Sequence, residues 1–249
     1  MSEIPMVAAR SAVKLHPRGR SFHSDVSTHI PTNAPGVIDL ETMAPLQVDG
    51  IRVDLVGMWE RAAPLLAIRD NDAHSLYALG IAASLAAALP EADPVVALPA
   101  ILLHDIGWSQ VPPDEVLAAI APGGGRPDLV RMHEVEGARL AQEILVDVGH
   151  DAAAIARIVE IIDGHDSRVH ALSIEDAIVK DSDKTWRVTP HGLDVVMEWF
   201  GLERHEALSL CASRVIDHLF TDPARALARG LVAMSSVTMW PQSAALGED

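Results

Sequence analysis

The chain has 249 residues, of which 49% are hydrophobic, so it can bury a sizeable core, and its formal net charge is -16 at pH 7. The negative charge argues against binding to nucleic acid or to an anionic membrane, because both require clustered Lys and Arg side chains. The single cysteine, Cys211, excludes an intrachain disulfide and a thiolate zinc site.

We expect a cytoplasmic protein, because no apolar run approaches the roughly 18 residues of a membrane span and no secretory leader is recognisable. Residues 1–45 mix Pro, His, Ser, Thr and Arg without periodicity, which predicts an irregular arm. The first 23 residues carry four basic and one acidic residue, so the remainder holds 15 basic and 34 acidic residues, a charge of -19. A small anionic substrate would therefore need a local cationic pocket or a metal.

From Val53 onward the apolar residues recur at helical spacing, and no window shows the alternation of a strand. We therefore predict an all-α fold, with one domain over residues 46–249. Proline and capping residues suggest where the helices begin. The predicted helices are 53–68, 71/72–89, 94–106, 113–121, 127–148, 151–164, 173–187, 190–200, 203–220 and 222–236.

The pair His104-Asp105 follows an apolar run, Val95–Leu103. An imidazole and a carboxylate at the buried end of an apolar helix must be compensated, and a metal ion is the common compensation for this pair. The pair therefore predicts a metal site.

Further nitrogen and oxygen donors lie on other segments predicted to be helical. In chain order the candidate ligands are His74, His104, Asp105, His133, His165 and Asp183. Any one of the histidines could instead be an ordinary buried side chain. Asp181 competes with Asp183, because Asp181 shares an apolar helical stripe whereas Asp183 shares a charged one, and spacing alone leaves both open.

Over roughly residues 70–190 these motifs resemble the HD-domain superfamily of metal-dependent phosphohydrolases. The resemblance is carried by His104-Asp105-Ile106-Gly107, by His133 with Gly137-Ala138, and by Asp181-Ser182-Asp183-Lys184. It implies an HD-domain helical bundle with additional C-terminal helices, Asp183 as the ligand and Lys184 as a phosphate contact.

The extra histidines are similar to those of the binuclear branches of the superfamily. The resemblance implies one metal on His74, His104, Asp105 and Asp183, a second on His133 and His165, and Asp105 as the bridge. These ligand types suit two divalent transition metals per chain, from among Fe, Mn, Co, Ni and Zn.

A binuclear centre suggests hydrolysis of a phosphate ester of a small metabolite or nucleotide. We predict catalytic roles for Asp105, Lys184 and Arg187. Lys180, Arg168 and Trp108 are the candidates for substrate binding, although the cations could form surface salt bridges and Trp108 could simply pack.

Two other functions stay open. A di-iron oxygenase of the same superfamily, oxidising a small hydroxy-phosphonate or polyol, would use the same ligand set. Trp108 stands where such a polyol oxygenase suggests a lysine, and His165 lacks a following histidine, which weakens that reading. The third is a non-catalytic module, which the complete ligand set disfavours. The helices of residues 189–236 could cap the bundle, shape the pocket or form a homodimer interface.

Overall fold

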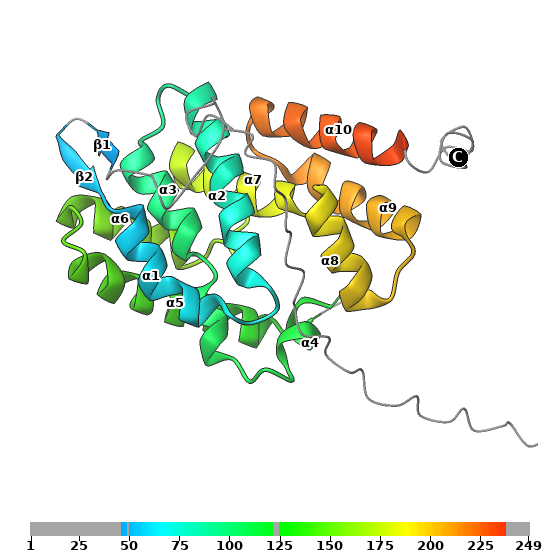
Figure 1. Cartoon of the computed structure of the whole chain (residues 1–249), viewed down its shortest axis with the longest axis horizontal. Coiled ribbons are helices and arrows are strands. Elements are labelled where there is room, and N and C mark those ends of the chain that lie inside the picture. Colours follow the sequence, from blue (N-terminus) through cyan, green and yellow to red (C-terminus); the bar gives the residue numbers. More distant parts are fainter. Residues whose placement is uncertain (1–45, 49, 122–124, 238–249) are drawn as a thin grey trace, which may run out of the picture. The chain divides into compact units, whose positions relative to one another are not determined.

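The computed structural model describes residues 46–48, 50–121 and 125–237, all of which belong to one compact unit (Figure 1). The predicted N-terminal arm falls outside these residues. The described residues form helices and one short β-hairpin, so the all-α prediction is confirmed. None of the described helices is long and apolar enough to cross a bilayer.

The hairpin was missed by the sequence analysis. Strand β1 (Leu46–Val48) pairs antiparallel with β2 (Ile51–Val53), and Gly50 adopts a positive φ of 83° between them. Strands of three residues are too short for their alternation to stand out. Val53, predicted to start a helix, ends β2 and is buried in the core.

The helices otherwise follow the predicted ranges, with ends that differ by a few residues. Asp and Thr side chains cap several of them, as in α1, where the Gly57 N–H donates to Asp54 at 2.9 Å. The α-helices are α1 (Leu55–Leu66), α2 (Asn71–Ala88), α3 (Pro94–Leu103), α4 (Val116–Ile120), α5 (Pro127–Asp147), α6 (Ala152–Ile162), α7 (Ile174–Trp186), α8 (Pro190–Phe200), α9 (Arg204–Val215) and α10 (Asp222–Val237). Two 3₁₀ helices, η1 (Ile106–Gln110) and η2 (Ile216–His218), complete the described part.

Helix α3 is the centre of the bundle. Every residue from Val95 to Leu103 is buried, and α1, α2, α6 and α7 all pack against this helix. The uncharged run of the sequence therefore reflects a helix without a solvent-exposed face. The helix was predicted to reach residue 106 but ends at Leu103. The His104-Asp105 pair therefore lies between α3 and η1.

Close backbone contact joins η1 to α5. A Cβ atom on Gly107 would collide with the carbonyl oxygen of His133 and the amide nitrogen of Gly137. The glycines in both motifs thus allow the His104-Asp105 segment and the His133 helix to approach each other at backbone distance.

The C-terminal helices α8, α9 and α10 lie together beyond α7 (yellow to red in Figure 1). Asp181 joins them to the bundle: its carboxylate accepts hydrogen bonds from the amides of Phe220 at 2.7 Å and Thr221 at 2.9 Å, and from the Thr221 hydroxyl at 2.8 Å. Asp181 is therefore a structural anchor for the segment that leads into α10.

Candidate metal centre

Three side chains from separate helical segments form what we call the first donor group: His74, His104 and Asp183. The Nε2 atom of His74 lies 3.1 Å from Nε2 of His104 and 3.4 Å from Oδ1 of Asp183. All three residues are buried. The first turn of α2, the end of α3 and the middle of α7 thus bring their ligand atoms to one point.

A second donor group lies beside the first and consists of His133, His165 and Asp166. Nε2 of His133 lies 3.4 Å from Nε2 of His165 and 3.6 Å from Oδ2 of Asp166. The two histidines are buried, whereas 29% of the Asp166 side chain is exposed. Asp166 was not among the predicted ligands, although the second His-Asp pair of the sequence pointed to it.

Asp105 lies between the two donor groups. Its Oδ2 atom is 3.4 Å from Nε2 of His74 and 3.6 Å from that of His104. Its Oδ1 atom is 3.8 Å from Nε2 of His133 and 3.6 Å from that of His165. One carboxylate oxygen faces each group, which is the arrangement expected of a bridging ligand.

Backbone carbonyls orient two of the imidazoles. Nδ1 of His104 lies 2.7 Å from the Ile101 oxygen, and Nδ1 of His165 lies 3.0 Å from the Ile162 oxygen. Only a protonated nitrogen can donate to a carbonyl, so in the neutral imidazole Nε2 carries the lone pair. Ligand histidines commonly make this type of hydrogen bond.

Asp105 and Asp183 are charged despite their burial. Burial raises the pKa of Asp105, but the surrounding imidazoles, that of His104 foremost, outweigh it and hold the pKa well below the usual value. Asp183 behaves in the same way, with Arg187 as the main opposing group, so its pKa is also held well below the usual value. Converging imidazole nitrogens and ionised carboxylates form a donor set that fits divalent transition metals.

Trp108 contacts both Asp105 and His133. Its Nε1–H donates to Oδ1 of Asp105 at 3.1 Å, and its ring stacks on His133 with centroids 3.9 Å apart. Only 2% of Trp108 is exposed, although it lines the cavity above the centre. The predicted substrate-binding residue is thus also a packing partner of two ligands.

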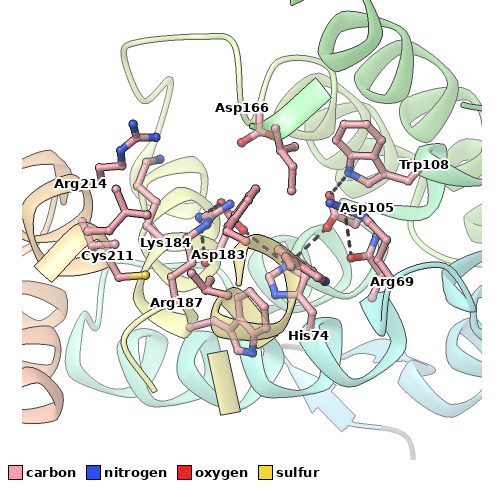
Figure 2. Close-up of a pocket in the computed structure, with 18 of the residues that line it drawn as sticks. Arg69, His74, Asp105, Trp108, Asp166, Asp183, Lys184, Arg187, Cys211 and Arg214 are labelled. Carbon is pink, nitrogen blue, oxygen red and sulfur yellow. Dashed lines mark hydrogen bonds and ion pairs between the residues drawn. The ribbon is translucent and has the colours of Figure 1, made fainter. Parts of the chain in front are cut away.

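A cavity of about 390 Å³ opens over the centre, and Figure 2 shows its lining. His74, Asp105 and Asp183 line it, as do the predicted catalytic residues Lys184 and Arg187. Apolar side chains from α8 and α9 complete the wall, which shows that the C-terminal helices shape the pocket. The lining residues from these two helices are Val196, Trp199, Phe200, Leu210, Cys211, Arg214 and Val215. Their predicted role in a homodimer interface stays a prediction.

Arg187 and Lys184 differ in their contacts. Nη1 of Arg187 donates to Oδ2 of Asp183 at 3.1 Å, so Arg187 orients a ligand of the first donor group. Among the residues that the structure describes, the Lys184 ammonium group has no hydrogen-bond or ion-pair partner, so it is available to a bound anion.

Lys180 and Arg168 do not line the cavity, contrary to the substrate contacts that we predicted for them. The Lys180 side chain is 1% exposed, and its ammonium group donates to the carbonyl oxygens of Gly164, His165 and Arg168 at 3.0, 2.6 and 2.9 Å. Arg168 donates to the Asp163 carbonyl and to the Asp176 carboxylate, both at 3.1 Å. Both cations support the loop between α6 and α7.

Glu134 holds the same loop from the opposite side, and the sequence analysis missed it. Its buried carboxylate accepts hydrogen bonds from the amides of Asp166 at 2.9 Å and Ser167 at 2.7 Å, and from the Ser167 hydroxyl at 2.7 Å. Glu134 therefore binds amide groups of the loop while Lys180 binds its carbonyls. The signal in the sequence that could have identified Glu134 was its position next to His133, a predicted ligand.

Arg69 is a further lining residue that was missed. It follows α1 and lies beside Asp105 and Trp108 in Figure 2. No motif distinguishes it in the sequence, because it falls just beyond the end of a predicted helix.

Comparisons with known proteins agree with this geometry. The family model of the HD domain matches residues 71–187, a segment that contains all six predicted ligands. A search of curated proteins and a search of solved structures gave no match. Residues 71–187 therefore form an HD domain, and this segment of the chain belongs to the HD-domain superfamily.

Proposed function

We propose that the protein is a metal-dependent phosphohydrolase that cleaves a phosphate ester of a small metabolite or nucleotide. The observation that carries this proposal is the position of Asp105, which lines a cavity and whose two oxygens face separate donor groups. HD domains are mostly metal-dependent hydrolases, which agrees with this reading.

The ligands fit two metals. His74, His104 and Asp183 would hold one ion, His133 and His165 would hold the other with Asp166 as an additional ligand, and Asp105 would contact both. Two such ions provide a nucleophile from water at neutral pH and neutralise charge on a phosphoryl group.

The protein side chains would supply binding and orientation. The indole N–H of Trp108 keeps the Asp105 carboxylate in place, and Arg187 does the same for Asp183. Lys184, which has no protein partner among the described residues, would pair with a phosphoryl oxygen. The wall from α8 and α9 would pack against the organic part of the substrate and exclude water.

Phosphate release from a panel of nucleotides and sugar phosphates tests the proposal. The protein would be stripped with a chelator and reloaded with Mn, Co, Ni, Zn or Fe. We expect metal-dependent turnover of at least one ester, lowered about 10- to 100-fold in Lys184→Met because one charge-assisted contact to the phosphate is lost. Arg139→Met, which removes an exposed charge on α5, is the matched control and should retain full activity.

Oxygen consumption separates hydrolysis from the oxygenase alternative. Iron-loaded protein that consumes dioxygen with a hydroxy-phosphonate or a polyol, and releases no phosphate from any ester, would contradict the proposal. Metal-dependent phosphate release without oxygen uptake would support it.

A further inference from the structure

Arg69 has an unusual backbone conformation beside the metal centre. Arg69 and Asp70 have φ angles of 57° and 58°, and they are the only non-glycine residues of the described chain with positive φ. Side chains with a Cβ atom adopt this conformation at a cost. It directs the chain from α1 into the first turn of α2, which carries His74.

The Arg69 guanidinium is held by two aromatic rings. Its Cζ atom lies 4.9 Å from the ring centre of Trp108 and 5.0 Å from that of Trp199. Trp108 belongs to η1, and Trp199 belongs to α8, beyond the segment that the HD family model matches. Stacking fixes the plane of a guanidinium while leaving the hydrogen atoms at its edge available to bind.

Those hydrogen atoms have few partners. The side chain makes one long hydrogen bond, from Nη2 to Oδ1 of Asn71 at 3.5 Å, while Nε and Nη1 are buried without a partner. No carboxylate of the described residues forms an ion pair with Arg69, although the charges of Asp105, Asp166 and Asp183 act on it. Arg69 itself is only partly buried, but buried N–H donors of a cation are costly to leave unused unless an anion compensates them.

Asn71 provides a second unsatisfied donor in the same place. It is 2% exposed, it lines the cavity, and its Nδ2 atom is buried without a hydrogen-bond partner. Arg69 and Asn71 therefore combine a fixed positive charge with unpaired N–H groups on the wall of the cavity next to Asp105.

We propose that Arg69 and Asn71 form a phosphoryl-binding subsite beside Asp105. The substrate's phosphoryl oxygens would occupy the unused donors of this pair, and Lys184 would contact the same group from α7. This inference rests on the proposed function for the identity of the anion. Because Trp199 holds Arg69, the subsite depends on α8 as well as on the HD domain.

Binding of inorganic phosphate to manganese-loaded protein tests the subsite without turnover. Titration calorimetry would measure the affinity, and tryptophan fluorescence would report on the two indoles beside Arg69. We expect Arg69→Gln to weaken phosphate binding about 10- to 100-fold, because a charge-assisted contact is lost. Arg69→Lys keeps the charge without the planar fork and should weaken it about 3- to 10-fold.

Arg61→Gln is the matched control, because Arg61 is exposed on α1 and outside the cavity lining. It should bind phosphate as the wild type does, and all variants should keep the wild-type metal content. If Arg69→Gln does not fold, phosphate binding is measured in Arg69→Lys and Asn71→Ala instead. Wild-type phosphate affinity in both of these variants would overturn the subsite.

Two further results would overturn the inference: phosphate affinity in Arg69→Gln within twofold of the wild type, or no phosphate binding by the wild type. A lower melting temperature with unchanged affinity would likewise mean that Arg69 only joins the two tryptophans.

If no ester is hydrolysed but phosphate binding depends on Arg69, the subsite stands and the proposed function fails. If esters are hydrolysed and Arg69→Gln binds phosphate normally, only the subsite fails.

Discussion

The two donor groups contain the same residue types but differ in how the protein holds them. In the first group the carboxylate of Asp183 is buried on α7 and paired with Arg187. In the second group Asp166 is partly exposed and lies on the loop between α6 and α7. The first group is thus built into packed helices, whereas the second depends on the contacts that hold a loop.

This difference predicts unequal metal affinities. A ligand set that is already in place loses less conformational freedom on binding than one carried by a loop. The first donor group should therefore bind its metal more tightly than the second. Asp105 faces both groups, so its replacement should weaken metal binding at both and remove the difference in affinity between them.

The largest effect is expected for Asp105→Ala. Among the described residues, Asp105 has the carboxylate that faces both groups, and its removal also leaves Trp108 Nε1 without its acceptor. We expect the loss of both metals and a fall in activity of at least about 1000-fold. Elemental analysis of the purified variant measures this, and wild-type metal content would contradict the bridging role.

A comparison of Asp183→Ala with Asp181→Ala comes next. Asp183→Ala should lose the metal of the first group and most activity, since Asp183 contacts both His74 and His104. Asp181→Ala should lower the free energy of unfolding by about 3 kcal/mol, because two buried donors and one partly buried donor lose their acceptor. The folded fraction of Asp181→Ala should keep its metals. Greater metal loss in Asp181→Ala than in Asp183→Ala would refute the assignment of Asp183 as the ligand.

Lys180→Met tests whether the loop contacts control the second group. Three carbonyls around His165 would lose their donor, so we expect a loss of about 2–4 kcal/mol of stability and selective loss of the second metal. Denaturant unfolding and metal titration measure the two effects. Arg139→Met, on the exposed face of α5, should change stability by no more than about 0.5 kcal/mol. Selective loss of the first metal from Lys180→Met would contradict the dependence of the second donor group on the loop contacts.

The smallest effect is expected for Asp166→Ala. An exposed ligand at the edge of the second group should contribute about 3- to 10-fold to the affinity of that metal and nothing to the first. Asp147→Ala, an exposed carboxylate at the end of α5, serves as the control. If Asp166→Ala binds the metal of the second group as tightly as the wild type does, Asp166 is not a ligand.

Much of the fold, and the convergence of the candidate ligands, could be predicted from the sequence. The uncharged run before His104 identified the central helix, and proline and capping residues located the helix starts. The six predicted ligands converge because they follow the family pattern. The choice between Asp181 and Asp183 needed the structure, since both are buried on α7. Asp181 contacts the segment before α10, whereas Asp183 contacts the histidines.

The residues that were missed act through tertiary contacts. Glu134 binds amides more than 30 positions away, and Arg69 stacks on a tryptophan from α8. Lys180 was assigned to the substrate because it is a cation near Asp183, but its helical position directs it to the α6–α7 loop instead. Such roles depend on which elements are neighbours, which spacing along one helix does not reveal.

The most direct test of the binuclear centre is the metal content of the wild-type protein. Elemental analysis would be performed on protein purified without chelator and again after equilibration with excess manganese and gel filtration. We predict about two metals per chain after equilibration, with the second removed at lower chelator concentration than the first. A chain that retains no metal under these conditions would contradict the account.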